Sequence, residues 1–125
     1  MKFGQRIQRE SQGAASSGWT EHFIDYAQLK LLIKDGRAES FVTELSVQVE
    51  KAGTLFQTQA YILQHALTTL DERTERQSGC GRLVELKTDA AKLQKFQVLN
   101  YLAVVKAVKK YNRWLAPQVG RLSAT

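Results

Sequence analysis

Four cations stand close together near the C-terminus, at Lys106, Lys109, Lys110 and Arg113, with no acidic residue between them. Their spacing of i, i+3, i+4 and i+7 places them on one side of a helix. Apolar residues take the other side: Val104, Ala107, Val108, Tyr111 and Leu115. One side of such a helix is suited to burial, and the other repels itself unless an anion binds there. The pattern predicts a surface for a densely negative partner.

The net charge of +6 belongs mainly to the last third of the chain. Residues 82–125 contain nine Lys or Arg and two acids, whereas residues 35–81 contain four Lys or Arg and seven acids. A localised basic excess concentrates anions more than a uniform one does. The stripe alone leaves three alternatives open, namely a solvated helix face, a nucleic-acid surface and an anionic-membrane surface.

Several function classes find no support in the sequence. The single cysteine, Cys80, excludes a disulfide framework and favours a reducing compartment. No apolar run is long enough to span a membrane, and the first residues show no signal region. His22 and His65 have no acid or cysteine at metal-ligand spacing, so no metal is expected. There is no Gly-rich phosphate loop, paired carboxylate or Ser-His-Asp set, so the chain is not expected to be an enzyme.

Apolar periodicity predicts an all-α fold in one domain of 125 residues. Helices are expected over 2–12, 21–34, 38–76 and 82–115. Thr20 is the expected N-cap of the second helix, Gly36 ends it, and residues 77–81 form the turn between the two long helices. Pro117 and Gly120 are expected to close the last helix.

The two long helices must lie antiparallel because a five-residue turn joins them. Their expected core residues are Phe41, Leu45, Val49, Ala52, Phe56, Leu63, Ala66 or Leu67 and Leu70 on the first, and Leu83, Leu86, Ala90, Leu93, Phe96, Val104, Val108 and Tyr111 on the second. The short N-terminal helices form a hairpin that must dock on this pair, since they are too short to make a core alone. Docking would bring Tyr26 and Lys30 towards the basic stripe. Asn100 is expected to be a hydrogen-bonded amide in the core.

Four segments, in order, resemble those of the SPX domain, the phosphate-sensing helical module of eukaryotes. They are Met1-Lys2-Phe3-Gly4; Phe23-Ile24-Asp25-Tyr26 with Leu29-Lys30 and Ile33-Lys34; Leu45 with Glu50-Lys51 and Phe56; and Leu99-Asn100-Tyr101 with Lys106, Lys109-Lys110-Tyr111 and Arg113. The resemblance runs from residue 1 to about 115, and none of its departures removes a phosphate-binding cation. It implies that residues 1–125 form an SPX-like domain, alone or at the N-terminus of a larger protein.

The resemblance also implies the ligand and the site. SPX domains bind inositol polyphosphates and pyrophosphates, such as inositol hexakisphosphate, and bind inorganic phosphate much more weakly. By position, the phosphate cluster is Tyr26, Lys30 and Lys106, the neighbouring cluster is Lys109, Lys110 and Arg113, and Lys2 and Lys34 lie at the same rim. No cofactor beyond this ligand is expected.

The resemblance places the domain in the cytoplasm or on the cytosolic face of a membrane. Its expected partner is a regulated protein or an attached catalytic or transport domain. The alternative is a basic helical protein that binds nucleic acid. That alternative is disfavoured because Tyr111 and Trp114 point away from the middle of the stripe, where bases would stack.

Overall fold

The computed structural model describes residues 2–14, 18–73 and 80–124. Its elements are α1 (Phe3–Gly13), the short 3₁₀ helix η2 (Thr20–His22), α2 (Tyr26–Lys34), α3 (Ala38–Arg73) and α4 (Cys80–Ala124). The described residues form no β-strand. The all-α prediction is therefore confirmed.

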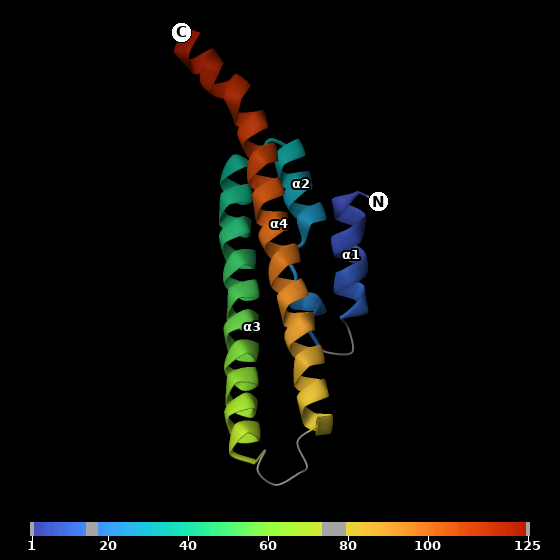
Figure 1. The fold of residues 1–125 in the computed structure, drawn as a ribbon. Coiled ribbons are helices and arrows are strands. Elements are labelled where there is room, and N and C mark those ends of the chain that lie inside the picture. Colours follow the sequence, from blue (N-terminus) through green and yellow to red (C-terminus); the bar gives the residue numbers. More distant parts are fainter. Residues whose placement is uncertain (1, 15–17, 74–79, 125) are drawn as a thin grey trace.

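The two long helices, α3 and α4, run antiparallel and side by side, and α1 and α2 lie on one side of this pair (Figure 1). This arrangement confirms the predicted helical bundle with a docked N-terminal helical segment. The core consists of buried apolar residues from α1, α2, α3, α4 and the segment before α2, including Ile7, Ile24, Leu29, Phe41, Leu55, Leu93, Phe96, Leu99, Ala103 and Ala107. The alanines at 103 and 107 are fully buried, which lets neighbouring helices approach α4 closely.

Aromatic rings and one ion pair fix the N-terminal segment on α4. The ring of Phe96 is packed edge-on by Phe23 at 4.8 Å and by Trp19 at 5.6 Å between centroids. Lys95 Nζ lies 2.9 Å from Glu10 Oε1, so α1 is also tied to α4 by charge. These contacts place the end of α1 beside the N-terminal half of α4, while Phe3 at the start of α1 lies near Lys106, further along α4.

The start of the second helix was predicted wrongly. Helix α2 begins at Tyr26, and its N-cap is Asp25, whose Oδ1 accepts a hydrogen bond from Gln28 N at 3.1 Å. The hydroxyl of Thr20 instead donates to Ser11 O at 2.6 Å, a contact between distant residues that favours a separate turn at Thr20–His22. The predicted end is confirmed, since Gly36 has a φ of 72° directly after α2.

The end of the last helix was also predicted wrongly. Helix α4 continues through Pro117 to Ala124, and its last turns extend beyond the start of α3 (Figure 1). Proline removes one backbone donor, whereas the residues that follow it keep theirs, so the helix can resume after one missing bond. At the other end α4 begins at Cys80, within the predicted turn, and residues 74–79 lie outside the described part of the chain.

Three predicted core positions are exposed, and a polar residue takes the place of one of them. Val49 is 42% exposed, Leu83 is 38% exposed, and Ala90 is also on the surface. Gln48 is 2% exposed and occupies the core position next to Val49. The face of α3 that is buried is therefore rotated towards α2 relative to the predicted one. Leu67 is exposed as well, while its alternative, Ala66, is half-buried.

Candidate functional site

Two aromatic rings and two lysines form the centre of the candidate site. Tyr26, the first residue of α2, packs edge-on against Phe3, the first residue of α1, with centroids 5.2 Å apart. Lys30 Nζ lies 5.2 Å from the Tyr26 ring, and Lys106 Nζ of α4 lies 5.4 Å from the Phe3 ring. The structure thus brings together Tyr26, Lys30 and Lys106, the three residues of the predicted phosphate cluster. Tyr26 and Lys30 belong to α2 and Lys106 belongs to α4, and the ring of Phe3 from α1 lies between them.

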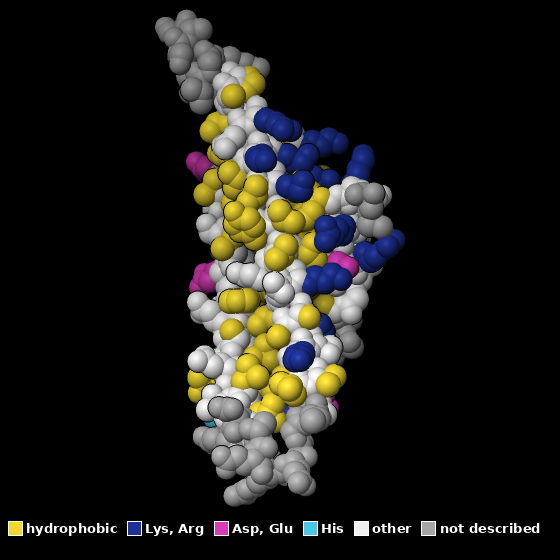
Figure 2. Space-filling view, in the orientation of Figure 1, with side chains coloured by type: hydrophobic (Ala, Val, Ile, Leu, Met, Phe, Trp, Pro, Cys, Tyr) yellow, Lys and Arg dark blue, Asp and Glu magenta, His cyan; other side chains and the backbone are white. Residues whose placement is uncertain are grey.

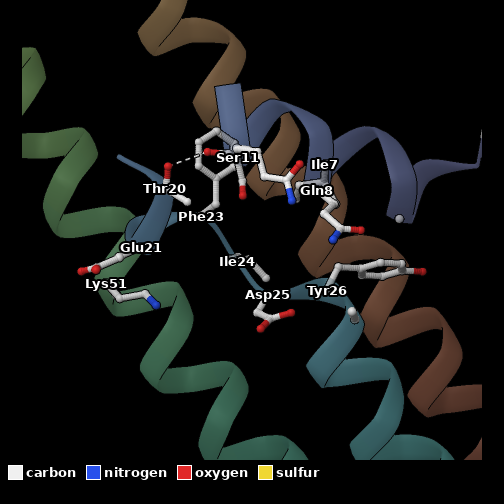
Figure 3. Close-up of a pocket in the computed structure, with 13 residues that line it drawn as sticks. Ile7, Gln8, Ser11, Thr20, Glu21, Phe23, Ile24, Asp25, Tyr26 and Lys51 are labelled. Atoms are coloured by element: carbon white, nitrogen blue, oxygen red, sulfur yellow. Dashed lines mark hydrogen bonds between the residues drawn. The ribbon is translucent and has the colours of Figure 1, made fainter. Parts of the chain in front are cut away.

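Tyr26 combines a buried ring with an available hydroxyl. The residue is 5% exposed, and burial raises the pKa of the phenol above its usual value of 10.0. Within the described residues its hydroxyl makes no hydrogen bond, so it remains a neutral donor for an incoming anion. The ring is directed away from Asp25 and Thr20 (Figure 3). A neutral hydroxyl beside two ammonium groups suits a phosphate oxygen.

A groove between α2 and α4 holds the next group of cations. Its volume is about 580 Å³, and its lining consists of Ala27, Lys30, Leu31, Ile33, Lys34, Lys110 and Arg113. Lys and Arg side chains gather over this part of the molecule (Figure 2). Lys30 lines this groove and also belongs to the group of Phe3, Tyr26, Lys30 and Lys106, which we call the ring cluster. The groove and the ring cluster therefore form one continuous basic surface.

The predicted cations of this surface are free of carboxylates. In the part of the chain that the structure describes, no Asp or Glu lies within ion-pair distance of Lys30, Lys34, Lys106, Lys109, Lys110 or Arg113. Lys109 is exposed but lines neither the groove nor the ring cluster. Lys2 is exposed at the N-cap of α1, and no contact of its side chain joins it to the cluster. The structure therefore gathers Tyr26, Lys30, Lys34, Lys106, Lys110 and Arg113, with Lys109 and Lys2 at the margins.

Two buried amides hold the segment that leads into Tyr26. Asn100 Oδ1 of α4 accepts from Ile24 N at 2.7 Å, and Asn100 Nδ2 donates to Phe96 O at 2.8 Å. Gln48 Oε1 of α3 accepts from Asp25 N at 2.6 Å. The prediction for Asn100 is confirmed. Gln48 was missed, and its only sequence signal was a polar residue beside the apolar positions of α3.

A second concavity lies between α1, the segment before α2 and α3 (Figure 3). Its volume is about 510 Å³, and among the described residues that line it Lys51 is the one cation, beside the acids Glu21 and Asp25. In its wall, the Thr20 hydroxyl donates a hydrogen bond to the backbone carbonyl of Ser11. This mixed lining does not concentrate anions, and the basic groove remains the better candidate.

The histidines offer no metal site within the described residues. No three His, Cys, Asp or Glu side chains gather there as metal ligands. His22 is half-buried with Nδ1 unpaired, and exposed His65 stacks on Tyr61 with centroids 6.4 Å apart. None of the described helices is long and apolar enough to cross a membrane.

The long helical pair, the docked short helices and the basic surface between α2 and α4 agree with the SPX-like domain that the four sequence segments predict. A curated protein agrees with this class: the chain is 28% identical to SPX domain-containing protein 5 of Oryza sativa subsp. indica over 128 residues. The match covers 90% of this chain and 51% of the rice protein, so the chain spans about half the length of the relative that it matches. No family model matches the chain, and no solved structure matches it. The resemblance to SPX domains, first seen in four short segments, thus extends over most of the sequence.

Proposed function

We propose that this chain is a phosphate-status sensor that binds inositol polyphosphates or pyrophosphates on its basic surface. The observation that carries the proposal is the convergence of Lys30, Lys106 and Lys110 from two helices, with no carboxylate of residues 2–14, 18–70 or 81–118 paired with them. An inositol ring that bears several phosphates can contact the ring cluster and the α2–α4 groove at once. The second contact is then effectively intramolecular, which a single phosphate cannot achieve.

The proposed role is regulatory and non-catalytic. Binding would report ligand concentration to a partner protein, or to a catalytic or transport domain attached to residues 1–125, in the cytoplasm or at the cytosolic face of a membrane. Lysine serves this purpose as a mobile point charge, and Arg113 adds a planar fork that can hold two oxygens of one phosphate. No cofactor or metal takes part.

Calorimetric titration tests this function with three ligands: inositol hexakisphosphate, inorganic phosphate and a short DNA duplex. Inositol hexakisphosphate should bind far more tightly than phosphate, and rising salt should weaken it because the contacts are ionic and exposed. Equal affinity for hexakisphosphate and phosphate, compared at equal ionic strength, would exclude the sensor function. Tighter binding of DNA would favour the nucleic-acid alternative.

Substitution of single cations tests the site. Lys106→Ala and Lys30→Ala should each weaken inositol hexakisphosphate binding by about tenfold or more, since each removes a charge-assisted hydrogen bond. Both residues are exposed, so the stability of the fold should change by less than about 0.5 kcal/mol. Lys87→Ala is the matched control, an exposed lysine of α4 outside the surface. Equal losses in all three variants would show only a response to net charge.

A further inference from the structure

The ring of Phe3 lies at the junction of the candidate site, although it carries no charge and no polar atom. It contacts Tyr26 of α2 edge-on at an interplanar angle of 89°, and Lys106 Nζ of α4 stands 5.4 Å from its centroid. A third helix, α1, supplies it. The order of contacts is therefore Lys106, Phe3, Tyr26 and Lys30, with each ring next to one ammonium group.

An aromatic ring is an unusual partner for a lysine that must bind an anion. A carboxylate would hold the ammonium more strongly, but it would neutralise the charge and occupy its donors. A ring attracts the ammonium through its quadrupole at distances within about 6 Å and leaves the charge in place. Lys106 is thus ordered before the ligand arrives, and less rotamer entropy remains to be lost on binding.

The edge-on contact with Tyr26 fixes the ring of Phe3 itself, and with it the place of Lys106 relative to the Tyr26 phenol. The positive edge of one ring against the negative face of the other favours this perpendicular arrangement. Gly4, the next residue of α1, lies directly beside this pair: a Cβ there would stand 3.6 Å from both Lys30 Nζ and Tyr26 Cδ2, in ordinary van der Waals contact. The start of α1 therefore borders the phenol and both ammonium groups.

We infer that Phe3 is a positioning residue, whose ring, fixed edge-on against Tyr26, holds the Lys106 ammonium beside the Tyr26 phenol in the arrangement that binds a phosphate group. The inference rests on the proposed function and adds to it a residue that does not touch the ligand. Phe3 acts through Lys106, so an aromatic ring at position 3 matters more than a side chain of the same volume.

Phe3→Leu tests the ring, because leucine keeps most of the apolar packing and removes the quadrupole. Inositol hexakisphosphate should bind about two- to fivefold more weakly, which corresponds to the cation–π energy of about 0.5–1 kcal/mol at an exposed site. Phe3→Tyr restores a ring and should recover the affinity. Phe56→Leu is the matched control, a half-buried aromatic residue of α3 away from the site, and should leave the affinity unchanged.

Double substitution separates positioning from packing. In a Lys106→Ala background, Phe3→Leu should have almost no further effect on affinity, since its target is gone. In a Lys110→Ala background it should keep its two- to fivefold effect. An equal effect in both backgrounds, or no recovery with tyrosine, would overturn the inference and leave Phe3 with a packing role only.

NMR of the free protein gives a readout that does not depend on any ligand. The ε-methylene protons of Lys106 should show an upfield ring-current shift that Phe3→Leu abolishes and Phe56→Leu preserves. If the parent protein fails to bind inositol hexakisphosphate while this shift is present, the proposed function fails and the ordering of Lys106 by Phe3 stands. Absence of the shift in the parent protein refutes the inference whatever the ligand does.

Discussion

Replacement of Asn100 should be among the most damaging single changes in the chain. The side chain is 4% exposed, and its two hydrogen bonds join α4 to a residue 76 positions earlier and to its own preceding turn. In Asn100→Ala, the N–H of Ile24 loses its acceptor in a buried place, which costs about 1–3 kcal/mol. A small cavity adds to this, for a total of about 2–4 kcal/mol.

Thermal and urea denaturation measure the effect. For a chain of this size the melting temperature should fall by roughly 8–15 °C. Asn100→Asp separates the two bonds, because a carboxylate can still accept from Ile24 N but, when ionised, cannot donate to Phe96 O. Gln97→Ala, at an exposed position of the same helix, is the control and should change stability by less than about 0.5 kcal/mol. If Asn100→Ala matched this control, the amide would not be the element that holds the segment before α2.

Two glycines should respond in opposite directions to alanine. Gly36→Ala should lose about 1–2 kcal/mol, because φ is 72° there, whereas Gly53→Ala should gain about 0.5–1 kcal/mol, because it lies inside α3 with no neighbour within 4 Å of the new methyl group. Denaturation curves that shift both variants the same way would contradict this reading of the backbone. For Tyr26, the raised pKa means that the unfolded state loses its proton first as the pH rises. The stabilising effect of the neutral phenol is thus complete below about pH 10 and is lost as the pH rises through the folded-state pKa. Tyr26→Phe should therefore flatten the decline of stability that is measured from about pH 9 to pH 11.

Most of the fold follows from the apolar pattern, because long helices packed at small angles keep a regular repeat. The two wrong helix limits depend on information that the repeat does not contain. Thr20 is a plausible N-cap by residue type, and only a contact with Ser11 removes it from that role. Pro117 would end many helices, yet α4 loses one donor there and continues.

The site was partly predictable for a similar reason. The spacing of charges on one helix predicts a basic stripe, and the SPX-like segments supply Tyr26 and Lys30 from another helix. The position of Lys109 outside the groove depends on which side of α4 meets α2, and this is settled by the burial of small residues such as Ala107. The role proposed for Phe3 could not be predicted from the sequence, because a ring–cation contact between α1 and α4 has no local sequence pattern.

The two buried amides have a consequence for the way in which the site is lost. Apolar contacts are non-directional, so alone they specify the position of α2 along the long helices less strictly than hydrogen bonds do. Asn100 of α4 and Gln48 of α3 accept hydrogen bonds from the consecutive N–H groups of Ile24 and Asp25. These two bonds fix the position of the segment along the helix pair. The distance between Lys30 and Lys110 is then determined by the integrity of the whole helix pair. Ligand binding should therefore disappear in the same cooperative transition as the fold, without a preceding stage in which the site loosens.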